Sequence, residues 1–153
     1  MNKPLLIVST VAAFMFASCD NENTTNPEPL GKVTIKGAVV SNLDEDDDPD
    51  GPTLEHIPAG VALYFIDDDS EALLATGTTT ADGYSQELEI AGPRTIKIIV
   101  GDFETEINVQ VDVDEFDKKD AVYAKRDPFY VAVQKGGTYI QNIEISQPTP
   151  TDF

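Results

Sequence analysis

Apolar and polar residues alternate over most of the chain after residue 31, and the longest regular run covers residues 103–114. Side chains point to alternate faces of a β-strand, so a run of this kind predicts a strand with one dry and one wet face. No stretch shows the 3.6-residue apolar period of a buried helix, which predicts an all-β domain. The core-facing side of the long run is expected to carry Phe103, Thr105, Ile107, Val109, Val111 and Val113.

Turn-forming pairs such as Asp82-Gly83, Gly92-Pro93 and Gly136-Gly137 divide this region into short segments. A single domain over residues 32–145 with a C-terminal tail at 146–153 is therefore expected, and short alternating strands at this spacing favour a β-sandwich. Segment 117–125 has no clear period and is expected to form a loop or one short helical turn. Seven or eight strands are expected, at about 32–40, 60–66, 71–77, 83–91, 94–100, 103–113, 128–134 and 138–145.

The first 18 residues have a different pattern: Lys3 is followed by an apolar run from Leu5 to Ala17 and a small residue, Ser18. A membrane-spanning helix needs about 20 apolar residues, so this shorter run is typical of a secretory signal peptide. The sole cysteine, Cys19, follows directly. Phe16-Ala17-Ser18-Cys19 resembles the motif at the end of bacterial lipoprotein signals. The resemblance implies cleavage before Cys19, lipidation of its thiol and anchoring in a membrane, with bacterial outer membrane as the expected location.

Residues 19–31 are polar and form an expected tether of roughly 45 Å when fully extended. The acidic residues Asp20 and Glu22 resemble the surface-export signal of Bacteroidetes lipoproteins, and they are equally consistent with a solvated linker. The orientation of the domain, outside the cell or facing the periplasm, is therefore left open.

Four segments of the expected domain resemble the carboxypeptidase regulatory-like and Cna-B-like domains. The segments that carry the resemblance are Lys32–Val40, the strand entry Ile57–Leu63, Thr78–Gly83 with Tyr84 after it, and, as the fourth of them, Leu88–Pro93. The resemblance implies an antiparallel transthyretin-like, or immunoglobulin-like, sandwich of seven to eight strands. One departure is Arg94, at a position where those families usually have an aromatic residue. This fold carries many functions, so the resemblance does not imply one.

The composition excludes several functions. Ten Lys and Arg against 28 Asp and Glu give a formal net charge of −18, which argues against nucleic-acid binding because phosphates need a basic surface. One histidine, His56, and no Gly-x-Ser-x-Gly motif argue against a hydrolytic triad. One cysteine argues against a disulfide framework and a multi-cysteine metal site. We therefore expect a protein that is not an enzyme.

Residues 44–55 form the most acidic stretch, with seven acids and no base. Calcium takes six to eight oxygen ligands, and Asp46, Asp48 and Asp50 alternate before Gly51, with Glu55 as a closing carboxylate. A complete twelve-residue calcium loop starting at Asp46 would need an acid where Ile57 stands, so a solvated loop is the other interpretation.

These features predict a lipid-anchored, non-catalytic envelope protein that presents its sandwich for structural or adhesive binding to an envelope protein or glycan. The alternative is a calcium-dependent ligand-binding module that uses loop 44–55. Carbohydrate would be a candidate ligand of such a module. Separately, five tyrosines could form a platform on which carbohydrate stacks, although sandwich cores and edges also use tyrosine routinely: Tyr64, Tyr84, Tyr123, Tyr130 and Tyr139.

Overall fold

The computed structural model of the protein describes residues 27–44, 53–113 and 115–151. These residues contain thirteen strands and no helix, which confirms the all-β prediction, and none of them belongs to a helix able to span a membrane. The strands are β1 (Gly31–Gly37), β2 (Val39–Ser41), β3 (Glu55–His56), β4 (Ala62–Asp67), β5 (Leu73–Thr78), β6 (Tyr84–Ile90), β7 (Arg94–Val100), β8 (Phe103–Asp112), β9 (Glu115–Tyr123), β10 (Pro128–Val133), β11 (Thr138–Ile140), β12 (Ile143–Glu144) and β13 (Thr149–Pro150).

Two sheets form the body of the domain, one with the strand order β11-β1-β6 and the other with the order β10-β7-β4-β5. Alternate residues of both sheets enter one apolar core, in which the rings of Phe65 from β4 and Tyr84 from β6 lie 6.0 Å apart. The expected β-sandwich is therefore present, and burial of these apolar faces is its main source of stability. The turn before Tyr84 is made by Gly83, whose φ of +117° suits glycine.

Three details of the predicted strands and their pairing are wrong. The described residues form thirteen strands rather than seven or eight, because the expected strands 32–40 and 138–145 are each divided in two and because β3, β9 and β13 were not expected. The pairing is not wholly antiparallel, because β11 runs parallel to β1 and β12 runs parallel to β2. The chain reaches β11 from β10 of the opposite sheet, so no hairpin forces it to reverse against β1. Segment 117–125 is neither a loop nor a helical turn, since most of it lies in β9, which pairs along the whole of β8. The partner strand decides this conformation, not the weak local pattern.

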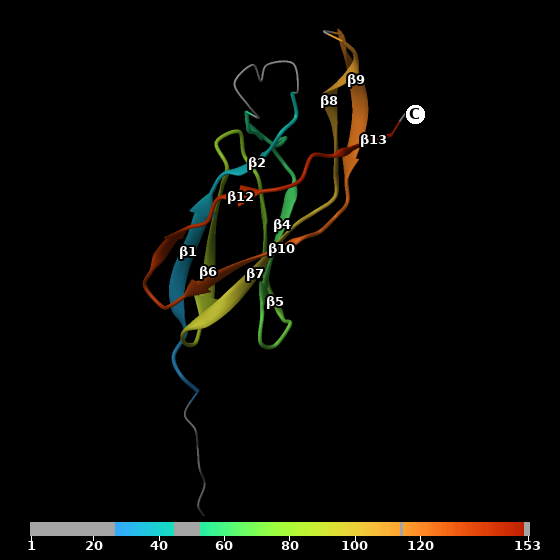
Figure 1. Cartoon of the computed structure of the whole chain (residues 1–153). Helices are drawn as coiled ribbons and strands as arrows, with labels where there is room; N and C mark the ends of the chain where they lie inside the picture. The colour runs from blue at the N-terminus through green and yellow to red at the C-terminus, as the bar shows by residue number, and fades with distance from the viewer. Residues whose placement is uncertain (1–26, 45–52, 114, 152–153) are drawn as a thin grey trace, which may run out of the picture.

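Strands β8 and β9 form a long hairpin that rises beyond the sandwich, with the short strand β13 beside β9 (Figure 1). At its base Phe103 and Tyr123 stack with ring centroids 5.4 Å apart, and Ile107 is buried. Farther out, Val111 and Val113 are 51% and 82% exposed. The predicted dry face is therefore correct for the inner half of this run and wrong for the outer half, which no second sheet of the described residues covers.

The two ends of the domain differ in what they carry. Residues 27–30 lead into β1 at the lower end of the molecule in Figure 1, whereas the outer part of the β8–β9 hairpin lies at the upper end. The expected C-terminal tail, residues 146–153, contains strand β13, which pairs with β9 of the same hairpin.

Candidate functional site

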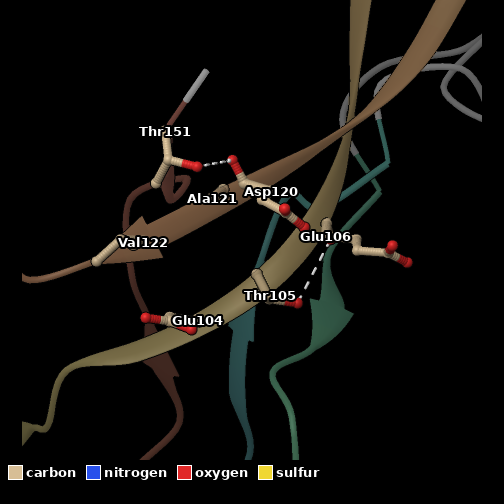
Figure 2. Close-up of a pocket in the computed structure, with 7 residues that line it drawn as sticks. All are labelled: Glu104, Thr105, Glu106, Asp120, Ala121, Val122 and Thr151. Atoms are coloured by element: carbon tan, nitrogen blue, oxygen red, sulfur yellow. Dashed lines mark hydrogen bonds between the residues drawn. The ribbon is translucent and has the colours of Figure 1, made fainter.

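A shallow pocket of about 400 Å³ lies on one face of the β8–β9–β13 sheet (Figure 2). The strand register explains which residues share this face, because Glu104 lies opposite Val122 and Glu106 lies opposite Asp120. Even-numbered positions of β8 and β9 thus point to the same side, as alternation along a strand requires. Its lining is Glu104, Thr105, Glu106, Asp120, Ala121, Val122 and Thr151.

A second pocket of about 320 Å³ adjoins the first and shares Thr105 and Glu106 with it. Its other lining residues are Leu43, Asp44, Glu55, Asn108 and Lys118. We call the two pockets together the acidic trough, because five carboxylate side chains line it and Lys118 is the one cation among its described lining residues. Asp44 and Glu55 are also the first and last residues of the acidic stretch 44–55, so the described ends of that stretch open onto the trough.

The carboxylates that join the trough to loop 44–55 take part in hydrogen bonds that hold the backbone in place. The Leu43 N–H donates to Glu55 Oε2 at 2.7 Å, and Asn108 Nδ2 donates to Asp44 Oδ1 at 2.5 Å. The Asn108 N–H also donates to the Leu43 carbonyl at 3.0 Å, which fixes the segment after β2 against β8. These bonds join Leu43 to Glu55 and Asp44 to Asn108, at the two described ends of the acidic stretch 44–55. Carboxylates at such a surface attract cationic groups.

The proposed calcium ligands are only partly described. Asp46, Asp48 and Asp50 lie outside the described residues, as does the expected lipidation site Cys19. Glu55 is described, and one of its oxygens accepts the Leu43 bond given above. No group of three or more metal-binding side chains occurs within residues 27–44, 53–113 and 115–151. Calcium binding by loop 44–55 stays a prediction.

The five tyrosines do not share one surface. The side chains of Tyr84 and Tyr123 are buried, and the Tyr84 hydroxyl donates to the Gln141 carbonyl at 2.8 Å. Burial raises the pKa of Tyr84 far above its usual value, so this hydroxyl stays protonated. Tyr64 and Tyr130 are 37% and 53% exposed, on β4 and β10. A platform made from all five residues is therefore not present.

An ion pair that the sequence pattern did not predict joins Asp67 and Arg94 at the end of β4. Asp67 is 3% exposed, accepts the N–H groups of Asp69 and Ser70 at 3.0 Å each, and pairs with the Arg94 guanidinium. The Ser70 bond and the Arg94 charge keep the pKa of Asp67 below its usual value, although burial acts in the opposite direction. The signal in the sequence was Arg94 at a position where an aromatic residue was expected, together with the acidic run Asp67–Asp69.

Comparison with known proteins gives little further information. No family model and no curated protein sequence matches the chain. A solved structure, the shaft pilin SpaA from Lactobacillus rhamnosus GG, matches with 14% identity and a TM-score of 0.33. The match covers 78% of this chain and 48% of that chain, so this chain spans less than half of the pilin's length. A TM-score this low establishes neither a shared fold nor a shared function.

Proposed function

We propose that the protein is a non-catalytic lipoprotein of the bacterial envelope that serves structural or adhesive binding. The observation that supports this proposal is that the N-terminal entry of the chain and the β8–β9 hairpin lie at opposite ends of the domain. The chain enters the sandwich from the expected anchor at one end, and the β8–β9 hairpin with the acidic trough lies toward the other (Figure 1). A lipid at Cys19 would then hold the membrane near the first end and leave the hairpin to face outward. Acyl chains contribute about 0.8 kcal/mol per buried methylene, so several chains anchor firmly.

Contacts near the start of β1 hold residues 28 and 29 against the body of the sandwich. Lys135 Nζ lies 2.6 Å from Glu28 Oε1 and 3.2 Å from the Pro29 carbonyl, next to the start of β1 at Gly31. This ion pair is exposed and contributes little stability. It nevertheless holds the last residues of the tether beside the turn between β10 and β11.

The hairpin end combines two features of an interaction surface. Val111 and Val113 expose apolar side chains that no other described element covers. The neighbouring trough presents Glu104, Glu106 and Asp120 on a rigid sheet face. Exposed apolar side chains beside ordered polar groups are typical of surfaces that bind other proteins.

The anchor and the orientation can be tested in one strain. Cys19→Ser should leave the precursor uncut or release the domain from the membrane fraction, whereas the wild-type protein should partition into detergent. Protease treatment of intact and permeabilised cells then distinguishes a surface location from a periplasmic one. An unchanged mature mass and unchanged detergent partitioning for Cys19→Ser would reject the lipid anchor.

The binding surface can be tested with a photo-crosslinking residue placed at Val113 in intact cells. A matched control places the same residue at Ile140, which is 72% exposed on β11 in the body of the sandwich. A discrete adduct at position 113 and none at position 140 is the expected result. Adducts of equal yield at both positions would reject the hairpin end as the specific surface.

A further inference from the structure

A second groove lies where the two sheets meet along β5 and β6, away from the acidic trough. Strand β5 pairs only with β4, and β6 pairs only with β1, so both are edge strands of the described sheets. Between their edges lies a groove of about 590 Å³, which we call the β5–β6 groove. Its lining is Thr76, Gly77, Thr78, Thr80, Asp82, Gly83, Tyr84, Ser85 and Gln86.

The backbone of β5 presents hydrogen-bonding groups to this groove. The Thr79 N–H donates to the Val61 carbonyl at 2.9 Å, so the backbone groups of Thr79 face the β4 side. Because direction alternates along a strand, those of Gly77 also face β4 and those of Thr76 and Thr78 face the groove. In the described sheets, Thr76 and Thr78 are in register with Tyr64 and Ala62 of β4, and no strand pairs with β5 on its other side.

The β5 edge also lacks the features that usually prevent a foreign strand from pairing. Natural edge strands carry charges or proline, or are covered, because an open edge is a template for another strand. The six residues of β5, Leu73 to Thr78, include neither a charged residue nor a proline. In contrast, the β8 edge carries Glu104 and Glu106, and the β10 edge begins with Pro128.

The side chains of the groove indicate which strand would fit. Tyr84, a core residue, lies in the lining, and a Cβ at Gly77 would meet Gln86 Oε1 at 2.8 Å and the Phe65 ring at 3.2 Å. On β5 itself, Ala75 is partly buried against the same core. A strand added beside β5 would point every second side chain to this core-facing side of the sheet, which favours apolar residues at those positions. Asp82, in the turn before β6, is the one charged residue in the lining of the groove, and its carboxylate favours basic residues at the alternate, outward positions.

We propose that the β5 edge binds an extended segment of another protein, in which apolar and basic residues alternate. The segment extends the β10-β7-β4-β5 sheet by one strand, and its backbone bonds to Thr76 and Thr78. A second copy of this chain is a poorer occupant. If two β5 edges paired, Asp82 of one copy would come close to acidic residues of the other copy. Each chain also has a net charge of −18, so the two copies would repel each other.

The test uses the full chain and a fluorescein-labelled eight-residue peptide of alternating valine and lysine, followed by fluorescence anisotropy. Two further peptides carry N-methyl groups at alternate residues, one on each edge of the extended peptide. A strand bound to β5 donates from one edge only. One methylated peptide should therefore bind at least roughly tenfold more weakly, because it loses its backbone bonds to Thr76 and Thr78, while the other keeps the original affinity.

The protein side of the contact is tested with Thr76→Pro, which removes the N–H that faces the groove and leaves the bonds to β4 in place. The matched control is Thr95→Pro in the central strand β7, which should lower the melting temperature. It shows how large the destabilisation is when a proline disrupts pairing inside the sheet. Thr76→Pro should keep the wild-type melting temperature and lose peptide binding by a similar factor. Equal binding of both methylated peptides, or full binding by a folded Thr76→Pro variant, would overturn the proposal. Sedimentation showing a dimer that Thr76→Pro disrupts would replace the partner segment by a second copy.

Discussion

Replacement of Asp67 by asparagine tests the ion pair that the sequence pattern did not predict. Asp67→Asn keeps the shape of the side chain and removes its charge. In the folded variant, the N–H groups of Asp69 and Ser70 then donate to a neutral acceptor instead of a carboxylate. The guanidinium of Arg94, which is one-quarter exposed, loses its charged partner. Breaking a buried pair costs about 3–5 kcal/mol, and the partial exposure of Arg94 reduces this to roughly 2–4 kcal/mol. At about 4 °C per kcal/mol, the melting temperature should fall by roughly 8–16 °C.

The matched control is Asp102→Asn. Asp102 also accepts two hydrogen bonds from an arginine, Arg126, at 2.9 and 2.6 Å, but its side chain is 44% exposed. Exposed pairs of this kind contribute little, so its melting temperature should change far less. Thermal unfolding followed by circular dichroism measures both variants, and equal shifts would refute the argument from burial.

The dependence on pH follows from the direction of the Asp67 pKa shift. Its pKa is lower in the folded than in the unfolded chain, so the stabilisation is complete above the unfolded value of about 3.9 and is lost as the pH falls through the folded value. The difference between wild type and Asp67→Asn should therefore be constant from pH 7 to about pH 5 and shrink below about pH 4. A difference that persists unchanged at pH 2 would show that the carboxylate charge is not its source.

Three further predictions concern the hairpin, the sandwich and the acidic loop. Ile107→Ala should lower the unfolding free energy, measured by urea titration, by about 2–4 kcal/mol. Val111→Ala, a control on the same strand at a half-exposed position, should change it by less than about 0.5 kcal/mol. Similar losses for both variants would mean that the core of the hairpin lies elsewhere. Tyr84→Phe should cost about 1 kcal/mol in the same assay through loss of the bond to a carbonyl, and an unchanged midpoint would mean that water replaces it. If loop 44–55 binds calcium, calorimetry should show heat that Asp46→Asn with Asp48→Asn abolishes, and no heat at millimolar calcium would reject the site.

The β8–β9 hairpin shows how far a local pattern reaches. Its alternation predicted β8 correctly, and with it the burial of Phe103 and Ile107. The same alternation continues to Val113, but Val111 and Val113 are exposed. A side chain is buried only where another part of the protein packs against it, and alternation along one strand does not predict that contact. Asn108 illustrates the same limit: it was expected on the wet face, and the structure shows its amide bound to Asp44 of a distant segment.

The candidate site was only partly predictable for a similar reason. Loop 44–55 was recognised as acidic from its composition, and Glu55 was named as a site residue. The other carboxylates of the trough, Glu104, Glu106 and Asp120, are ordinary wet-face residues in the sequence. They meet Asp44 and Glu55 only because β8 lies against the segment that follows β2. Sequence spacing contains no information about such a pairing.

By itself the sequence determined the class of the fold, most strand positions and the Gly83 turn, and it predicted lipidation at Cys19, which stays a prediction. Each of these depends on short-range rules: alternation, turn conformation and a contiguous motif. Only the tertiary structure decided that β11 runs parallel to β1, that β9 is a strand, that Asp67 and Arg94 pair, and that β5 is an open edge. These features depend on which segments become neighbours, and pairing between distant strands is fixed by packing of the whole chain rather than by any local preference.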